Sequence, residues 1–290
     1  MEKKIIVIGS GPAGISAALY ARRGGASVTV VTKGQGALAK AERIENYYGF
    51  PEPVTGAELE RRGIEGARRL GITLQSGEVM QLGFNDTFDG YTVAGKDFEL
   101  SAPSVILAAG ASRKSVQIPG IAELEGKGVS YCAICDAFFY RKKRVGVIGA
   151  GAYALHEAEV LAPHVSELHI LTNGAEETAQ FPQGMTVHTS KLSSIKGTEH
   201  VESVVFEDGA ELPLDGVFIA IGTAGSVVLA KKMGIQLDGR SVKVDDNMAT
   251  NVPGIFAAGD CTGGLLQVAK AVYEGSKAGL SAVNYLRSKS

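Results

Sequence analysis

The sequence predicts an α/β protein made of two doubly wound units, the second of them inserted into the first. The main observation is an internal repeat, in which an apolar strand ends in a glycine-rich run that opens a helix. The repeat occurs over 3–8 and again over 144–148. Each copy later closes with another apolar strand that ends in glycine, at 105–110 and 217–222. This is the plan of two Rossmann-like dinucleotide-binding domains of the three-layer ββα type.

The elements follow the same order in both halves. In the first half, we expect a helix over 15–23, a strand over 27–31 and short antiparallel strands near 91–100, where polar and apolar residues alternate. In the second half, the counterparts are a helix over 155–161, a strand over 167–171 and antiparallel strands near 201–212.

The end of the chain belongs with the first half. Residues 251–260 form a turn and a strand that ends in Gly259-Asp260, and a last helix is expected over 266–286. We therefore expect one domain over 1–113 and 244–290, which would bind the dinucleotide. The inserted domain would span 114–243 and carry a cysteine pair.

Composition excludes several classes of function. The hydrophobic fraction of 45% suits a buried core, and the formal charge of −2 indicates neither nucleic-acid nor membrane binding. No apolar run approaches the ~20 residues of a membrane-spanning helix. The N-terminus enters a strand at once and lacks a signal-peptide cleavage site, so we expect a soluble, cytoplasmic protein.

The first glycine run, Gly9 to Gly14, predicts a dinucleotide site. Gly9 and Gly11 would let the backbone approach a pyrophosphate, and Gly14 would let the helix pack against the strand. The acid that usually ends the second strand and binds the ribose is missing, because Thr32-Lys33 stands there. Thr32 or backbone groups would then hold the ribose, with Gly259-Asp260 as a second anchor.

The second run has Gly149 and Gly151, followed by an alanine in the third slot. A 2′-phosphate of NADPH needs cations near the end of the next strand, yet no arginine occurs between Arg144 and Arg240. The segment after that strand instead carries Glu176 and Glu177, which would repel a phosphate. The sequence therefore favours a second loop that binds no nicotinamide cofactor, with NADH less excluded than NADPH.

Cys132 and Cys135 form a CxxC pair directly before the second repeat. Two thiols at this spacing can close a redox disulfide, and a helix start lowers the pKa of a thiol. A metal site would need more ligands, but only Cys261 remains and the histidines lack matching spacing, so no metal is expected. Asp136 is a candidate proton donor and acceptor, or else a capping residue.

These motifs together resemble the low-molecular-weight thioredoxin reductases over nearly the whole chain. The matching segments are the glycine run at 9–14, IENYYGFP at 44–51, LAAG at 107–110, GVSYCAICD at 128–136 and VPGIFAAGD at 252–260. The resemblance implies FAD in the first domain, Cys135 facing the flavin as a thiolate, Cys132 attacking the disulfide of thioredoxin, and Asp136 supplying the proton. The candidate FAD-binding residues are Gly9, Gly11, Pro12, Ala13, Gly14, Thr32, Lys33, Asn46, Ala109, Gly110, Gly259, Asp260, Gln267 and Val268.

Departures from the NADPH-dependent members point to the ferredoxin-dependent flavin thioredoxin reductases, which the chain also resembles in GALAKAE at 36–42 and GGLLQV at 263–268. In place of His-Arg-Arg after the second strand it has Thr172-Asn173-Gly174. The resemblance thus implies a homodimer that takes electrons from reduced ferredoxin. Three alternatives stay open: an NAD(P)H-dependent thioredoxin reductase, an FAD-dependent dithiol oxidase, and a flavin-binding redox sensor.

Overall fold

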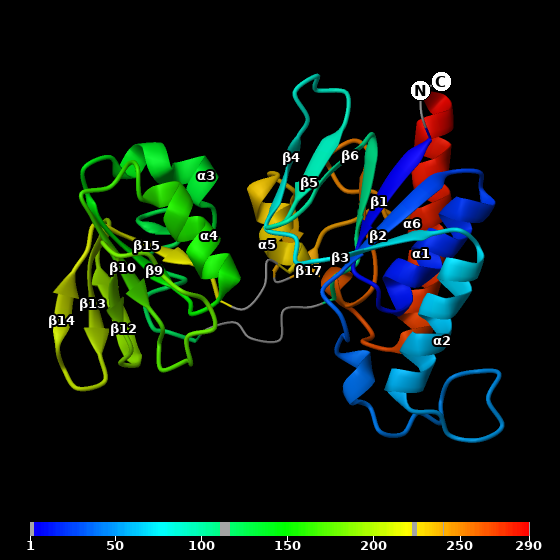
Figure 1. Cartoon of the computed structure of the whole chain (residues 1–290), viewed down its shortest axis with the longest axis horizontal. Coiled ribbons are helices and arrows are strands. Elements are labelled where there is room, and N and C mark those ends of the chain that lie inside the picture. The colour runs from blue at the N-terminus through cyan, green and yellow to red at the C-terminus, as the bar shows by residue number, and fades with distance from the viewer. Residues whose placement is uncertain (1–2, 111–116, 222–224, 240, 290) are drawn as a thin grey trace. The chain divides into compact units, whose positions relative to one another are not determined.

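The computed structural model describes residues 3–110, 117–221, 225–239 and 241–289, apart from the side chain of Cys135. The chain divides into two compact units (Figure 1). Unit 1 comprises Met1–Ser112 and Ala224–Ser290, and unit 2 comprises Arg113–Thr223. An inserted second unit is therefore present, as the repeat predicts.

The predicted return to the first unit at residue 244 is wrong by 20 residues, since the chain returns at Ala224 (244 − 224). The reason is helix α5 (Ser226–Lys232), which packs in unit 1 against β4 and β17. The Lys232 ammonium also donates a hydrogen bond to the Met80 carbonyl oxygen at 3.3 Å. The predicted boundary at 113 falls outside the described residues.

Unit 1 has a five-stranded parallel sheet in the order β18-β7-β1-β2-β3. Its strands are β1 (Lys4–Ile8), β2 (Ser27–Thr32), β3 (Thr73–Ser76), β7 (Ser104–Leu107) and β18 (Ile255–Ala257). Three antiparallel strands follow β3 in the chain, β4 (Gln81–Phe84), β5 (Tyr91–Ala94) and β6 (Glu99–Ala102), and a small ribbon pairs β16 (Leu237–Asp238) with β17 (Ser241–Val242). Besides α5, the helices are α1 (Pro12–Arg23), α2 (Gly56–Arg69) and α6 (Val268–Ser288), with short 3-10 turns η1 (Leu38–Lys40) and η3 (Asp260–Thr262).

Helices α1 and α6 touch backbone to backbone. A side chain at Gly275 would collide with the Ala13 carbonyl, and one at Gly279 would collide with the Ala17 carbonyl. These glycines are four residues apart, so they lie on one face of α6. Because no side chain separates the helices there, the end of the chain is held against the first turns of α1.

Unit 2 repeats the plan with a parallel sheet in the order β11-β10-β9-β15-β8. Its strands are β8 (Val129–Ser130), β9 (Arg144–Ile148), β10 (Glu167–Leu171), β11 (Thr186–His188) and β15 (Gly216–Ile219), and its antiparallel strands are β12 (Leu192–Gly197), β13 (Val201–Phe206) and β14 (Glu211–Pro213). The helical elements are α3 (Ala133–Asp136), η2 (Ala137–Tyr140) and α4 (Ala152–Leu161). One buried cluster joins Ile148 and Leu171 of the parallel sheet to Ile195 and Val204 of the antiparallel sheet.

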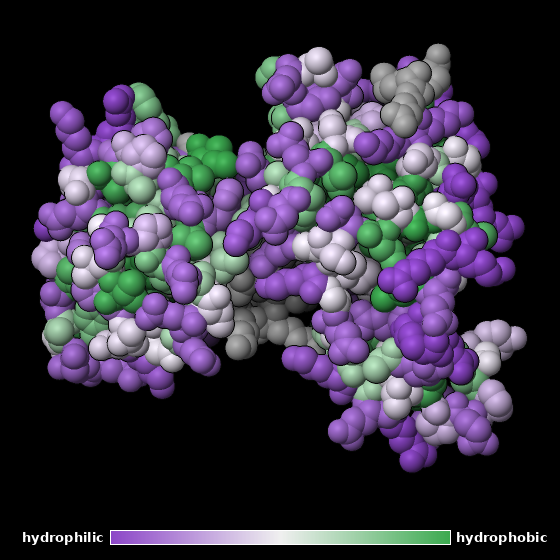
Figure 2. Space-filling view, in the orientation of Figure 1, coloured by the Kyte–Doolittle hydropathy of each residue, from purple (hydrophilic) through white to green (hydrophobic). Residues whose placement is uncertain are grey.

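The predicted strands over 144–148 and 167–171 are confirmed. The two helices that follow the glycine runs begin three residues earlier than predicted, at Pro12 and Ala152. In both places the glycine run itself forms the first turn, which the expected apolar periodicity does not reveal. In the part of the chain that the structure describes, no helix is long and apolar enough to cross a membrane. Hydrophilic residues cover most of the face shown in Figure 2.

We predict opposite effects for alanine at two helical glycines. Gly279→Ala should lower stability by about 1–3 kcal/mol, because its methyl group would push α6 off α1. Gly66→Ala, in α2, should raise stability by about 0.5–1 kcal/mol, since nothing lies within 4 Å of the added carbon and alanine favours a helix. Thermal unfolding followed by circular dichroism measures both. Equal effects of the two changes would contradict the proposed contact.

Candidate functional site

The first glycine loop leaves an open cradle at the start of α1. Gly9 has φ +113°, and a side chain there would collide with the Ala108 carbonyl, while one on Gly14 would collide with the Gly9 carbonyl. Gly11, by contrast, has nothing within 4 Å of its added carbon. Gly11 is also the N-cap of α1 and provides no side-chain cap. The first N–H groups of α1 therefore remain available to an anion in the open space.

Three adjacent strand ends meet at this loop. Ala109 and Gly110 follow β7, and Gly259-Asp260 follows β18, which pairs with β7. A side chain on Gly259, at φ +86°, would lie 2.7 Å from the Ala13 methyl carbon. The structure thus brings together the residues that the sequence predicts at this site: Gly9, Gly11, Pro12, Ala13, Gly14, Ala109, Gly110, Gly259 and Asp260.

Asn46 and Gln267, 221 residues apart in the chain, also meet. The Asn46 side-chain amide donates to the Gln267 side-chain oxygen at 3.1 Å. Gln267 is the N-cap of α6, and Val268 is the first residue of that helix. Ser226 was missed by the sequence prediction: its fully buried hydroxyl accepts a hydrogen bond from the Ala109 N–H at 2.9 Å. A lone serine in an apolar segment carries no signal of this contact.

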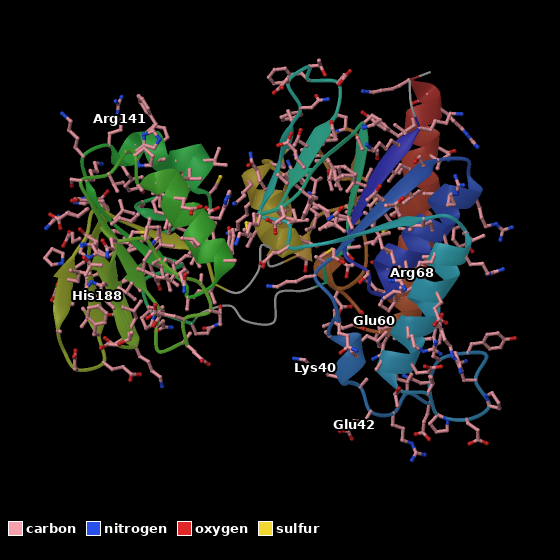
Figure 3. The ribbon with its side chains drawn as sticks, in the orientation of Figure 1. Lys40, Glu42, Glu60, Arg68, Arg141 and His188 are labelled. Atoms are coloured by element: carbon pink, nitrogen blue, oxygen red, sulfur yellow. The ribbon has the colours of Figure 1, made fainter. Side chains whose placement is uncertain are left out.

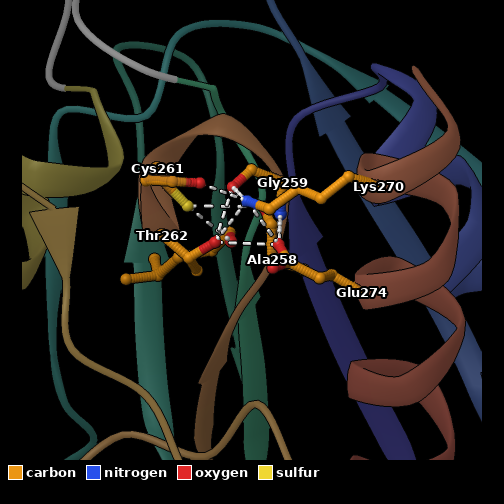
Figure 4. Close-up of polar contacts among 8 residues, drawn as sticks. Ala258, Gly259, Cys261, Thr262, Lys270 and Glu274 are labelled. Atoms are coloured by element: carbon orange, nitrogen blue, oxygen red, sulfur yellow. Dashed lines mark hydrogen bonds and ion pairs between the residues drawn. The ribbon is translucent and has the colours of Figure 1, made fainter. Parts of the chain in front are cut away.

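A second group missed from sequence holds the Gly259-Asp260 turn (Figure 4). The Glu274 carboxylate accepts from the Gly259 N–H and from the Thr262 hydroxyl, each at 2.8 Å. Lys270, one turn earlier on α6, pairs with Glu274 at 2.9 Å and donates to the carbonyls of Gly259 and Gly263 at 2.8 and 2.6 Å. Both side chains are largely buried. The ion pair therefore holds the Gly259-Asp260 turn against the first two turns of α6.

The cysteine segment lies in unit 2 between β8 and η2. Cys132 is buried and disulfide-bonded. Its pairing with Cys135 stays a prediction, because the Cys135 side chain is outside the described residues. The buried carboxylate of Glu157, on α4, accepts a hydrogen bond at 2.7 Å from the N–H of Ala133, the first residue of α3. This contact anchors α3 to α4.

Asp136 is held close to Cys132 by a serine. The Ser130 hydroxyl donates to the Asp136 carboxylate at 2.6 Å and accepts from the Cys132 N–H at 3.1 Å. Burial raises the pKa of the nearby Tyr140, and the charge of Asp136 raises it further. The Ser130 hydroxyl therefore links the Asp136 carboxylate to the backbone of Cys132.

The second glycine loop is covered by its own chain. Thr178 donates to the Ala150 carbonyl from its N–H at 2.8 Å and from its hydroxyl at 3.4 Å. A side chain on Gly151 would lie 3.1 Å from the Thr178 hydroxyl oxygen. The Thr178 hydroxyl, in the segment after β10, thus lies against Gly151 of the second glycine loop.

The end of β10 offers little to a 2′-phosphate. Asn173 is at φ +53°, and its side-chain oxygen accepts from the Leu192 N–H at 2.8 Å. The methylene chain of Lys191 crosses Gly174, and Glu176 and Glu177 are exposed nearby in the chain. Among the described residues, no cluster of three or more His, Cys, Asp or Glu side chains could hold a metal ion.

Comparison with known proteins gives consistent results. The model of the pyridine nucleotide-disulphide oxidoreductase family matches residues 3–275. The thioredoxin reductase of Aquifex aeolicus is 33% identical, over 98% of this chain and 94% of the relative. That of Bacillus subtilis is 32% identical, over 97% and 94% of the two chains.

Two solved structures are similar along their whole length. The atypical thioredoxin reductase TRi from Desulfovibrio vulgaris Hildenborough has a TM-score of 0.92 and 39% identity, with 99% of each chain covered. A ferredoxin-flavin thioredoxin reductase from Clostridium acetobutylicum has a TM-score of 0.80 and 32% identity, with 98% of each chain covered.

We predict that Cys261 is inert in the folded protein. Burial raises the pKa of its thiol to about 11, and the thiolate is the reactive form. With the Cys132 disulfide intact, a thiol reagent at pH 8 should label no cysteine quickly, and should label Cys261 after unfolding in guanidinium. Cys261→Ala should remove that late signal. Rapid labelling of the native protein at Cys261 would contradict its burial.

Proposed function

Because the chain belongs to the pyridine nucleotide-disulphide oxidoreductase family, we propose that it is a thioredoxin reductase that receives its electrons from reduced ferredoxin. It is a flavoprotein whose cofactor is FAD. We place the FAD at the first glycine loop, and the exchange with thioredoxin at Cys132 and Cys135.

The residues of unit 1 fit FAD. Gly11 has open space in front of it, the uncapped start of α1 faces that space, and the first N–H groups of α1 suit a pyrophosphate. The Lys270–Glu274 pair fixes the turn that presents Asp260, whose carboxylate would accept hydrogen bonds from the ribitol hydroxyls. Gln267, with Asn46 bonded to it, would lie beside the pyrimidine end of the flavin. Thr32 ends the strand next to the loop, Lys33 follows it, and these two residues complete the proposed set.

Bound FAD, once the donor has reduced it by two electrons, would supply an electron pair to the disulfide. Reduction takes two electrons and two protons and yields two thiols. Asp136, held by Ser130 beside Cys132, would deliver and take up a proton at the sulfur. Cys132 would then attack the disulfide of thioredoxin, forming a mixed disulfide that Cys135 resolves.

The choice of ferredoxin as donor rests on the contact between Thr178 and the second glycine loop. A bound nicotinamide dinucleotide would have to displace Thr178 from Ala150 and Gly151 and place a phosphate near Glu176 and Glu177. A donor that delivers electrons without occupying that loop avoids both costs. The similar solved structure from Clostridium acetobutylicum is that of a ferredoxin-flavin thioredoxin reductase, which supports the same donor class.

A docking surface for ferredoxin is proposed at the basic run 141–144, after η2. Arg141 (Figure 3) lies over the Phe138 ring at 5.4 Å, and Lys143 over Tyr140 at 5.5 Å, so both charges are presented on aromatic rings. Arg144 instead pairs with Asp215 at 3.4 Å. An acidic partner would be steered by the exposed cations.

We also propose a cytoplasmic homodimer. The exposed Tyr273 and Leu280 are seven residues apart on α6 and thus share a face, and Leu265 and Leu266 are exposed just before that helix. A second copy would cover these apolar side chains.

We expect both Cys132→Ser and Cys135→Ser to abolish thioredoxin reduction while FAD content stays normal, because each removes one sulfur of the disulfide. Turnover of thioredoxin disulfide by catalytic amounts of protein, with ferredoxin as donor, measures this. Cys261→Ala is the matched control and should retain activity, since that buried thiol lies in unit 1. Normal turnover in both serine variants would refute the disulfide route.

We expect reduced ferredoxin, and not NADPH or NADH, to bleach the flavin absorbance under argon. Reduction by ferredoxin should slow as salt rises, because screening shortens to about 8 Å near 0.15 M. Dithionite bleaches the flavin by either route and serves as the control. Rapid bleaching by micromolar NADPH would overturn the proposed donor and favour an NAD(P)H-dependent enzyme.

A further inference from the structure

Strand β2 ends without the carboxylate that usually holds the adenosine ribose of a bound dinucleotide. The strand ends at Thr32, and Lys33 follows. The Thr32 hydroxyl is already engaged, with the Ser10 hydroxyl at 2.6 Å and the Gly34 N–H at 3.1 Å. Lys33 pairs with Glu78 at 2.7 Å. At this strand end, therefore, the Thr32 hydroxyl is already hydrogen-bonded and Lys33 is a cation. Neither residue provides a negatively charged hydrogen-bond acceptor for a ribose hydroxyl.

A carboxylate reaches the same loop from helix α2. One Glu60 oxygen, Oε1, accepts a hydrogen bond at 3.1 Å from the N–H of Gly36, four residues after the end of β2 (36 − 32). Glu60 is only 6% exposed, and its other oxygen, Oε2, is buried without a hydrogen-bond partner among the described residues. A buried carboxylate oxygen without a donor is costly, so a donor from a ligand would relieve the site.

The packing of α2 places Glu60 between a contact with α1 and a contact with η1. Gly63, three residues later, faces α1, because a side chain there would lie 3.5 Å from Ile15. Gly56, four residues earlier, lies so close to η1 that a side chain would collide with the Leu38 carbonyl. Residues three and four apart share a helix face, so Glu60 lies between these two contacts. Figure 3 labels Glu60 on α2 and Lys40 of η1.

We propose that Glu60 is the ribose-binding carboxylate of the FAD site, supplied by α2 in place of the missing acid at the end of β2. Oε1 stays on Gly36 and fixes the side chain, while Oε2 accepts a hydrogen bond from a ribose hydroxyl. A carboxylate repels a phosphate, so the site selects an adenosine ribose that carries no 2′-phosphate. The inference rests on the proposed placement of FAD at the first glycine loop and holds for any electron donor.

Glu78 is the rival acid at this edge of the sheet. Its Oε1 is also buried without a partner among the described residues, but its Oε2 pairs with Lys33. The lysine neutralises the Glu78 charge, whereas no cation pairs with Glu60 among the described ion pairs. Glu78→Gln is therefore the matched control, since it also changes one carboxylate in the same region to an amide.

The test measures flavin binding to the full chain stripped of its flavin. FAD, FAD with a 2′-deoxyadenosine ribose, and FMN are each titrated while flavin fluorescence is followed. Glu60→Gln should weaken FAD binding roughly tenfold or more, because a charge-assisted hydrogen bond becomes a neutral one. The wild-type protein should prefer FAD to the deoxy form, and the variant should lose most of that preference. FMN affinity should be equal in both, since FMN has no adenosine ribose.

The flavin-free proteins separate this role from a structural one. Gln keeps an acceptor for the Gly36 N–H and removes a buried charge, so flavin-free Glu60→Gln should unfold at the wild-type temperature or higher. Unchanged FAD affinity, an intact preference for FAD over the deoxy form, or the same loss in Glu78→Gln would overturn the inference. A wild-type protein that binds FMN as tightly as FAD would overturn the FAD placement itself, and the inference with it.

Discussion

The close approach of backbone to backbone around the first glycine loop is the constraint on which unit 1 depends. Side chains at Gly9 and Gly14 would collide with the carbonyls of Ala108 and Gly9, and side chains at Gly275 and Gly279 would collide with carbonyls of α1. The strand end, the first helix and the last helix can therefore meet without side chains between them. This contact leaves the open space at Gly11, where a pyrophosphate can reach the start of α1.

Carboxylates of buried or partly buried glutamates also fix the backbone in both units. Glu60, Glu157 and Glu274 each accept a hydrogen bond from a backbone N–H, at Gly36, Ala133 and Gly259 respectively. Each fixes a turn or helix start to a neighbouring helix. The charge of Glu274 is balanced by Lys270, whereas one oxygen of Glu60 has no donor among the described residues. Glu274 is therefore a structural anchor, whereas Glu60 has an oxygen that a ligand could hydrogen-bond, as proposed above.

The glycine loops of the two units have the same backbone turn but different surroundings. The glycine turns are alike, because Gly9 and Gly149 both have positive φ and both lie against the end of a neighbouring strand. At the first loop Gly11 faces open space, but at the second Gly151 faces Thr178. The second loop thus keeps the glycine turn but places a threonine hydroxyl against Gly151, and the cysteine segment with Cys132 and Asp136 lies in the same unit.

The sequence by itself determined the repeat, the strand and helix on either side of each glycine loop, the loops themselves and the cysteine segment. These are local patterns, since apolar periodicity and glycine spacing follow from the geometry of strands, helices and tight turns. Tertiary structure alone decided that α5 returns to unit 1 at Ala224, that Ser226 meets Ala109, and that Glu60 reaches Gly36. These contacts join segments far apart in the chain, and a single Ser or Glu has no local pattern that marks its partner. Their positions depend on how whole elements pack, so only the folded chain reveals them.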